Sequence, residues 1–138
     1  MNKKIEGIKN VLISNEIQPS LQRIKIYEFL LGNKTHPTAD TIYNNINKEL
    51  AIISKATVYN TLKLFVEKNI ISEITIDNTE SRYDYNTEFH GHFKCEQCGE
   101  LYDLTLQQGF LDSLNLDGYK INSSHLYIKG ICKKCKNN

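Results

Sequence analysis

The sequence predicts an α+β protein in two parts, an N-terminal winged helix-turn-helix domain followed by a small α+β domain. Three observations lead to this fold class. Apolar residues recur at the spacing of helices from residue 3 to residue 68. The period then changes to the alternation typical of strands, beginning with a β-branched run at 70–76. All four cysteines lie after residue 94, which sets the second part apart chemically.

Length and composition fit a globular chain with one domain or two small ones. Of the 138 residues, 40% are hydrophobic and 24% are charged, close to the average of soluble domains, which argues against general disorder. The longest apolar run, Leu50-Ala51-Ile52-Ile53, has four residues, too short to span a bilayer. The first residues also lack the apolar segment of a signal peptide. We therefore expect a cytoplasmic protein with no membrane partner.

Two helices are expected before residue 34. Apolar residues at steps of three and four over 5–12 predict the first helix. Pro19-Ser20 then restarts the chain into a second apolar stripe over 21–31. Gly32-Asn33 is expected to end this second helix, because these residues favour helix ends.

Two further helices with a short connector predict a helix-turn-helix. Thr38 is expected to cap a helix over 39–49, and Ser54 is expected to cap the helix that begins at Lys55. The connector at 50–54 has the length found in helix-turn-helix motifs. In such motifs the second helix inserts its N-terminal turn into the major groove of DNA.

The later change of period predicts a two-stranded ribbon, the wing, after Asn69 ends the fourth helix. Residues 70–76 would form one strand, 77–79 the turn and 81–85 the return strand. We place the domain boundary at residue 82, giving domains 1–82 and 83–138. In the second domain we expect a helix over 106–114 and short strands near 93–94, 101–104, 119–122 and 125–131.

Charge is divided unevenly between the two parts. Residues 1–75 hold ten Lys and Arg against seven Asp and Glu, whereas residues 76–138 hold seven against nine. The positive excess of the first part favours a nucleic-acid partner only weakly, because a mixed solvated surface would have a similar composition.

Two Cys-x-x-Cys pairs predict a structural zinc site. Each pair can place two thiolates about 2.3 Å from one ion, and two pairs complete a tetrahedron without an open position for catalysis. The 33 residues between the pairs exceed the loop of a simple zinc ribbon, so we expect a folded segment fixed at both ends. Disulfides are one alternative, disfavoured in a reducing cytosol, and a redox-active pair is another. The residues are Cys95, Cys98, Cys132 and Cys135.

A second group of potential ligands is rich in histidine and aspartate. On a strand, the spacing of His90 and His92 would point both imidazoles to one face, although a surface pair would show the same spacing. Imidazoles with carboxylates suit iron(II), manganese(II) or zinc in five or six coordination positions. His125 begins an alternating run and is expected to be structural or exposed. The groups able to converge on a second metal are His36, Asp84, His90, His92 and Asp103.

Several polar residues of the first domain are candidates for DNA contacts. Those after residue 54 lie off the apolar stripe of their helix, where they could reach phosphates or base edges. Lysines 3, 4 and 9 are further candidates for backbone contacts. A helical bundle with a solvated polar face is the alternative. The main candidates are Gln22, Arg23, Lys55, Thr57, Tyr59, Asn60 and Lys63.

The ordered motifs of nearly the whole chain resemble the ferric uptake regulator family. The resemblance implies a homodimeric, metal-dependent transcription repressor that binds an inverted repeat in double-stranded DNA through a winged helix and dimerises through its second domain. It further implies structural zinc at the four cysteines and regulatory iron(II) or manganese(II) at the histidine and aspartate group. The matching segments are Gln22-Arg23, His36-Pro37-Thr38-Ala39, SKATVYNTL at 54–62, Arg82-Tyr83-Asp84, HGHFKCEQCG at 90–99 and the terminal cysteine pair.

Aspartate at position 84, together with Asp103, looks most like the peroxide-sensing branch of the family. In that branch the histidines matching His36 or His90 are oxidised and repression ends. Iron-uptake and zinc-uptake repressors share the scaffold and remain the alternative. Because Phe89 and Gly91 occupy the alternate places that some relatives use for a third metal, a third site with His125 is not expected.

Two other functional classes are alternatives to a repressor. A metalloenzyme is disfavoured, because no motif supplies a positioned nucleophile or a substrate pocket. A zinc-stabilised protein-interaction module would differ from a repressor in that its binding would not depend on a second metal.

Overall fold

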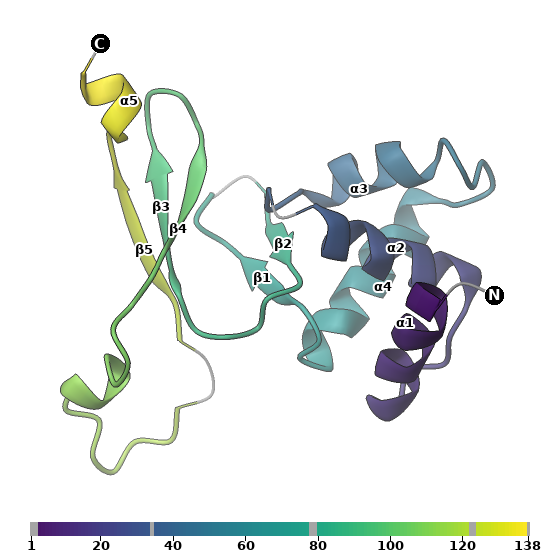
Figure 1. Cartoon of the computed structure of the whole chain (residues 1–138), viewed down its shortest axis with the longest axis horizontal. Helices are drawn as coiled ribbons and strands as arrows, with labels where there is room; N and C mark the ends of the chain where they lie inside the picture. Colours follow the sequence, from purple (N-terminus) through teal and green to yellow (C-terminus); the bar gives the residue numbers. More distant parts are fainter. Residues whose placement is uncertain (1–2, 34, 78–79, 122–123, 138) are drawn as a thin grey trace. The chain divides into compact units, whose positions relative to one another are not determined.

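The computed structural model of the chain describes residues 3–33, 35–77, 80–121 and 124–137 (Figure 1). Its contacts divide the chain into two compact units, Met1–Thr87 and Glu88–Asn138, which we call unit 1 and unit 2. In the described ranges, unit 1 has helices and a two-stranded ribbon, and unit 2 has a three-stranded sheet with short helical turns. The α+β class expected from the sequence is confirmed. Among the described residues, no helix is long and apolar enough to cross a membrane.

The helices of unit 1 begin where the sequence supplies capping side chains. The hydroxyls of Ser20, Thr38 and Ser54 each accept a hydrogen bond from the backbone N–H three residues later. Such a cap satisfies one of the N–H groups that have no partner within the first turn of a helix. The caps expected at Thr38 and Ser54 are confirmed, and Ser20 is a further cap that the structure adds. The helices are α1 (Lys3–Ser14), α2 (Leu21–Gly32), α3 (Ala39–Ile46) and α4 (Lys55–Glu67).

The sequence predicts the end of α4 correctly but not the end of α3. Asn69 has φ 60° after α4, a left-handed conformation that asparagine tolerates better than most residues, as expected. Helix α3 is shorter than the expected 39–49. Asn47 caps it, and the N–H groups of Glu49 and Leu50 both donate to the carbonyl of Ile46, so the chain turns toward α4 about one turn earlier.

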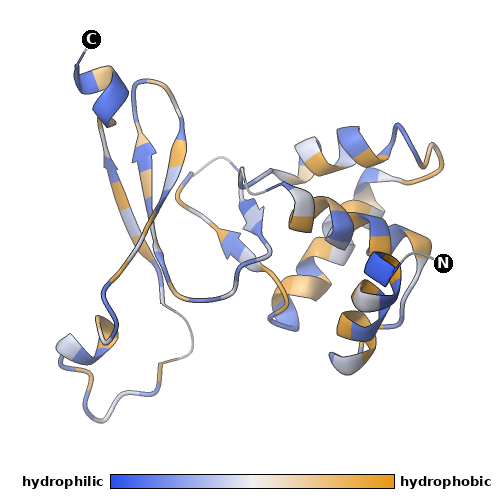
Figure 2. Cartoon of the chain, in the orientation of Figure 1, coloured by the Kyte–Doolittle hydropathy of each residue, from blue (hydrophilic) through white to orange (hydrophobic). Residues whose placement is uncertain are grey.

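The apolar faces of these helices pack into one core. Figure 2 shows hydrophobic and hydrophilic residues alternating along the helices, as expected when one face is buried. Tyr27 of α2 meets Phe65 of α4 edge to face, with ring centroids 5.9 Å apart, a favoured geometry. Fully burying one such side chain stabilises the fold by about 1.5–3 kcal/mol. The most buried side chains of this core include Leu12, Ile26, Leu30, Ile42, Val58, Leu62 and Phe65.

The wing follows α4 as an antiparallel ribbon of β1 (Ser72–Ile74) and β2 (Arg82–Asp84). Both strands are shorter than expected, and β1 begins only at Ser72 because Ile70 and Ile71 already pack into the helical core. Of the expected turn at 77–79, residues 78 and 79 lie outside the described residues. The wing is joined to the loop before α3, since the N–H of Tyr83 donates to the carbonyl of Pro37 at 2.9 Å.

Unit 2 is built on a sheet in the order β4-β3-β5. Strand β3 (Gly91–Cys95) pairs antiparallel with β4 (Leu101–Leu104) and parallel with β5 (Leu126–Gly130). A Cβ added at Gly91 would lie 3.2 Å from a Leu126 methyl and 3.3 Å from Leu104 Cβ, so a larger residue here would require these side chains to move by a few tenths of an ångström. A short helix, α5 (Lys133–Lys136), follows β5 (Figure 1).

Two of the secondary-structure predictions for unit 2 are wrong. Instead of a helix over 106–114 there is only a three-residue 3-10 turn, η1 (Leu111–Ser113). Gly109 has φ 81°, which breaks a helix, and η1 has no side-chain cap. The expected strand at 119–122 is not formed by residues 119–121, where Tyr119 instead donates its N–H to the carbonyl of Leu116; residue 122 lies outside the described residues.

Candidate metal centres and nucleic-acid interface

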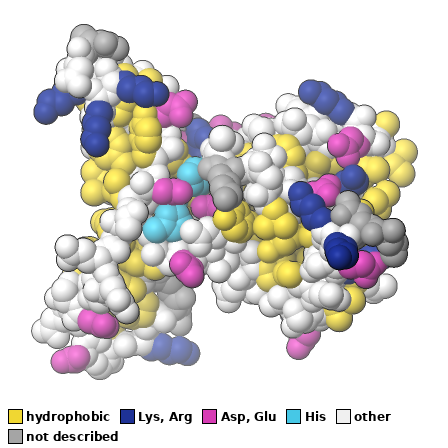
Figure 3. Space-filling view, in the orientation of Figure 1, with side chains coloured by type: hydrophobic (Ala, Val, Ile, Leu, Met, Phe, Trp, Pro, Cys, Tyr) yellow, Lys and Arg dark blue, Asp and Glu magenta, His cyan; other side chains and the backbone are white. Residues whose placement is uncertain are grey.

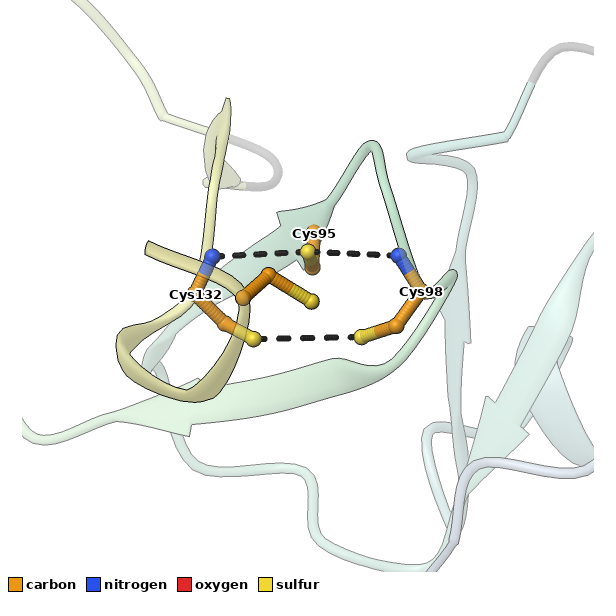
Figure 4. A group of neighbouring side chains, drawn as sticks. Cys95, Cys98 and Cys132 are labelled. Atoms are coloured by element: carbon orange, nitrogen blue, oxygen red, sulfur yellow. Dashed lines mark hydrogen bonds between the residues drawn. The ribbon is translucent and has the colours of Figure 1, made fainter. Parts of the chain in front are cut away.

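The four cysteines gather at one end of the unit 2 sheet. Cys95 ends β3 and Cys98 lies in the following turn, while Cys132 precedes α5 and Cys135 lies within it. All four are free thiols, and their sulfur atoms lie within 4.8 Å of one another. In Figure 4 the sulfurs of Cys98 and Cys132 point toward one another, 3.8 Å apart. Four bonds of about 2.3 Å in a tetrahedron give sulfur separations of about 3.8 Å, so these residues fit a zinc ion.

Backbone groups prepare this cluster to carry negative charge. The N–H groups of Cys98 and Cys132 each donate to the sulfur of Cys95 at 3.4 Å, and these hydrogen bonds lower the pKa of the Cys95 thiol to about 6. The neighbouring Cys132 sulfur raises the pKa of Cys135 to about 12. Four sulfur atoms this close cannot all be thiolates without a cation between them, which is what zinc would supply.

Lysines lie around the cysteine cluster. Figure 3 shows Lys and Arg side chains gathered near the C-terminal end of unit 2, where α5 contributes Lys133, Lys134 and Lys136 and β3 contributes Lys94. Their positive charge would partly offset the net negative charge of a zinc ion bound by four thiolates.

Unit 1 places one imidazole beside one carboxylate. His36 lies in the loop before α3 and Asp84 ends β2. Nε2 of His36 is 3.5 Å from Oδ2 of Asp84, and the two side chains are only 4% and 6% exposed. The other oxygen, Oδ1 of Asp84, accepts the N–H of Asn86 at 3.0 Å, which fixes the carboxylate. The pair offers a nitrogen and an oxygen ligand from two elements far apart in the sequence.

The loop that carries His36 is held by the wing. His36 has φ 59°, an unfavourable conformation for a residue with a side chain. Arg82 of β2 donates from Nη1 to the His36 carbonyl at 3.3 Å, and its Nε donates to Asp77 at 3.2 Å. These contacts stabilise the strained loop and hence the position of the His36 imidazole.

Unit 2 brings three further ligand atoms together on its sheet. His92 and Asp103 are direct partners across β3 and β4. Oδ1 of Asp103 lies 3.3 Å from Nε2 of His92 and 3.4 Å from Nε2 of His90, and the two imidazole centroids are 4.4 Å apart. Nδ1 of His90 is 2.8 Å from the carbonyl of Glu88. In the tautomer in which Nδ1 donates to this carbonyl, Nε2 carries the lone pair that a metal needs.

His125 stands apart from this group. It is exposed, and its Nδ1 lies 3.0 Å from the hydroxyl of Tyr127. This placement agrees with the expectation that His125 is a structural or exposed residue.

The candidate DNA-contacting residues lie on two helices of unit 1. Gln22 and Arg23 are in the first turn of α2, and the others are on α4. Four of them, Gln22, Arg23, Thr57 and Asn60, line one open polar recess of about 460 Å³. Lys63 is exposed further along α4. The structure thus brings two candidates on α2 next to two candidates on α4 that lie 34 or more positions later in the sequence.

The remaining two candidates contact helix α3. The hydroxyl of Tyr59 donates to Oδ1 of Asp40 at 3.3 Å, and Nζ of Lys55 lies 5.6 Å from the centroid of the Tyr43 ring. Sequence reasoning assigned no role to Asp40 or Tyr43. Their spacing of three on one helix was visible, but their partners depend on how α3 packs against α4.

Comparisons with known proteins agree with this architecture. A sequence model of the ferric uptake regulator family matches residues 14–128. The peroxide-responsive repressor PerR of Staphylococcus aureus (strain USA300) is 36% identical over 118 residues, which cover 83% of this chain and 80% of that protein. Among solved structures, Helicobacter pylori Fur superposes with a TM-score of 0.76 at 22% identity, covering 98% of this chain and 93% of that one. The Campylobacter jejuni peroxide stress regulator superposes with a TM-score of 0.67 at 28% identity, covering 98% and 100%.

The family match and the curated relative each cover most of the chain, and both agree with an α+β fold that carries two groups of metal-ligand side chains. The chain therefore belongs to the ferric uptake regulator family and is a metal-responsive transcription regulator, not an enzyme.

Proposed function

We propose that this protein is a cytoplasmic, homodimeric repressor that binds an inverted-repeat operator in double-stranded DNA and senses peroxide through its regulatory metal site. The observation that carries the proposal is the convergence of His90 and His92 on one oxygen of Asp103, at 3.4 and 3.3 Å. The similarity to proteins named as a peroxide-responsive repressor and a peroxide stress regulator supports the same reading.

The regulatory ion, iron(II) or manganese(II), would be bound by ligands from both units. Three imidazole nitrogens and two carboxylate oxygens form a hard, mixed ligand set that suits these ions. His36 and Asp84 come from unit 1 and the other three from unit 2, so one ion bound by all five would restrict the angle between the units. The proposed ligands are His36, Asp84, His90, His92 and Asp103.

This restriction would link metal binding to DNA binding. A dimer fits its operator only when its two reading helices match half-sites about one helical turn, or a multiple, apart. An ion that binds one arrangement more tightly shifts the population toward it. A shift from about 1% to about 99% requires roughly 5.5 kcal/mol, which several metal–ligand bonds can provide.

The cysteine cluster would have a separate, structural role. Cys95, Cys98, Cys132 and Cys135 would enclose zinc completely, so substrate and peroxide would have no coordination position there. The zinc would join the turn after β3 to α5 and thereby hold the ends of the sheet together.

In unit 1 we propose α4 as the helix that enters the major groove. Its polar residues would contact bases and phosphates, while the first turn of α2 would contact the backbone across the recess of about 460 Å³. The proposed contacts are Gln22, Arg23, Lys55, Thr57, Tyr59, Asn60 and Lys63.

Peroxide sensing would end in the oxidation of a ligand. Iron(II) held at this site would supply the electron transfer that activates hydrogen peroxide. One carbon of the His36 or His90 imidazole would gain one oxygen atom, the imidazole would lose two electrons, and the second peroxide oxygen would leave as water. The oxidised ring would be a poorer metal ligand, so operator binding would be lost and repression would end.

The test compares two forms of the zinc-loaded protein, one with iron(II) and one with manganese(II), before and after hydrogen peroxide. We expect one added oxygen atom on a peptide containing His36 or His90, and loss of operator binding, in the iron form alone. Metal-dependent DNA binding with no iron-dependent oxygen addition would instead indicate an iron-uptake or zinc-uptake repressor.

A further inference from the structure

Helices α3 and α4 contact each other through two side-chain pairs in register; Tyr43 is half-buried and the other three side chains are exposed. Asp40 and Tyr43 are three residues apart on α3, and Lys55 and Tyr59 are four apart on α4, so each set shares one helix face. Tyr59 pairs with Asp40 at 3.3 Å, and Lys55 lies over the ring of Tyr43 at 5.6 Å. The α3 face therefore supports two of the side chains that α4 would present to DNA.

These pairs add little to the stability of the helix packing. Tyr59 is 48% exposed and Asp40 is exposed, so water competes for both groups. The buried contacts between the helices come from their apolar stripes, including Ile42, Val58 and Leu62. We therefore expect the Asp40–Tyr59 pair to act at the outer surface of the helices and not in their packing.

The chemistry of the pair fixes what Tyr59 can offer to a ligand. A tyrosine hydroxyl has one proton to donate and lone pairs to accept, whereas an ionised carboxylate only accepts. The Tyr59 proton is therefore directed to Asp40, and the lone pairs of its oxygen remain for another partner. Partial burial and the nearby Asp40 carboxylate also raise the pKa of Tyr59, so the hydroxyl keeps this proton.

We propose that Asp40 is a specificity-determining residue that makes the Tyr59 hydroxyl a hydrogen-bond acceptor toward the major groove. This rests on the proposed function, in which α4 reads DNA. An acceptor pairs with the amino groups of adenine or cytosine and not with the acceptor atoms of guanine and thymine or with phosphates. Without Asp40, the freed proton would pair with any of those acceptors, and the discrimination at that base would be lost.

The test uses a library of duplexes with a randomised central segment, from which metal-loaded full-length protein selects its own sites. Wild type, Asp40→Ala, Asp40→Asn and Tyr59→Phe are compared. Asp40→Asn is the matched control, because it removes the same charge from the first turn of α3 but keeps an oxygen that accepts the Tyr59 proton. Thermal unfolding of each variant reports whether the fold is retained.

We expect wild type and Asp40→Asn to prefer adenine or cytosine at one position of each half-site. Asp40→Ala and Tyr59→Phe should each lose this preference by roughly tenfold while the rest of the site is unchanged. Combining Asp40→Ala with Tyr59→Phe should cause no further loss, because both act on one contact.

Two results would overturn the proposal: Asp40→Ala selecting the same bases as wild type, or Asp40→Asn losing the preference as fully as Asp40→Ala. The second result would assign the effect to charge and not to the direction of the proton. Selection of no sites by metal-loaded wild type would instead overturn the proposed DNA-binding function, and this inference with it.

Discussion

Arg82 in the wing donates from Nη1 to the backbone carbonyl of His36, 46 residues earlier in the chain, at 3.3 Å. The same side chain donates to Asp77 and is 25% exposed. His36, a proposed metal ligand with a left-handed backbone conformation, is thus held in place by Arg82, whose side chain would not itself bind the metal. Residues of this kind commonly change metal affinity without touching the ion.

We predict that Arg82→Gln weakens manganese(II) binding by about tenfold. The substitution removes the hydrogen bonds from the guanidinium group to Asp77 and to the His36 carbonyl. Metal binding would then have to order the loop that carries His36, which lowers the affinity. Calorimetric titration of zinc-loaded protein measures the effect, and the zinc content should not change. Lys25→Gln is the matched control, since Lys25 is also paired with carboxylates but lies on α2. Equal affinity of Arg82→Gln and wild type would exclude the positioning role.

The cysteine cluster predicts that unit 2 depends on zinc for its fold. Cys132→Ser should abolish stoichiometric zinc binding and unfold the sheet, because the binding free energy of structural zinc, about 10–16 kcal/mol in zinc-finger peptides, is also folding free energy. Zinc content and near-ultraviolet circular dichroism report the two effects. Asp103→Ala should retain both zinc and fold, which separates the cysteine site from the histidine and aspartate group.

Gly91→Ala is expected to destabilise unit 2 by about 1–3 kcal/mol. The added methyl would lie 3.2 Å from Leu126 and 3.3 Å from Leu104, so β4 and β5 would have to separate from β3. Urea unfolding measures the change. In contrast, Gly7→Ala meets nothing within 4 Å and lies inside α1, where alanine should stabilise by about 0.5–1 kcal/mol. An equal effect of the two substitutions would contradict this packing argument.

Two buried tyrosines predict a loss of stability at alkaline pH. Burial raises the pKa of Tyr27 and of Tyr83 above the ordinary value of 10.0. The folded state therefore holds these protons more tightly than the unfolded state. Their contribution is complete below pH 10 and falls as pH rises through the folded pKa values, because the unfolded chain ionises first.

Denaturant unfolding of the protein at a series of pH values from 8 to 11 tests this dependence. Tyr27→Phe and Tyr83→Phe should each flatten the alkaline decline, whereas Tyr119→Phe, at a side chain that is 74% exposed, should not. An unchanged slope in both buried variants would refute the assignment.

The sequence predicted best those features that depend on neighbouring residues. The caps at Thr38 and Ser54 are set by a side chain and an N–H three residues apart, so the sequence determines them locally. The two cysteine pairs were also evident, since each needs only a short turn to direct two sulfurs to one point.

Features that depend on packing were harder to predict. A helix was expected over 106–114, but Gly109, with φ 81°, leaves only a short 3-10 turn there. Residues 119–121 alternate like a strand, yet Tyr119 forms a turn with Leu116. The pairing of Asp40 with Tyr59 was also not predictable, because it depends on the angle at which α3 crosses α4.

The central claim is that one ion is bound by residues of both units. Manganese(II) titration of zinc-loaded wild type, His36→Ala and His92→Ala tests it most directly, because the two histidines belong to different units. We predict one manganese ion per wild-type chain and its loss in both variants, with zinc retained in each. Wild-type manganese affinity in either variant would show that one unit binds the ion alone and would contradict the account.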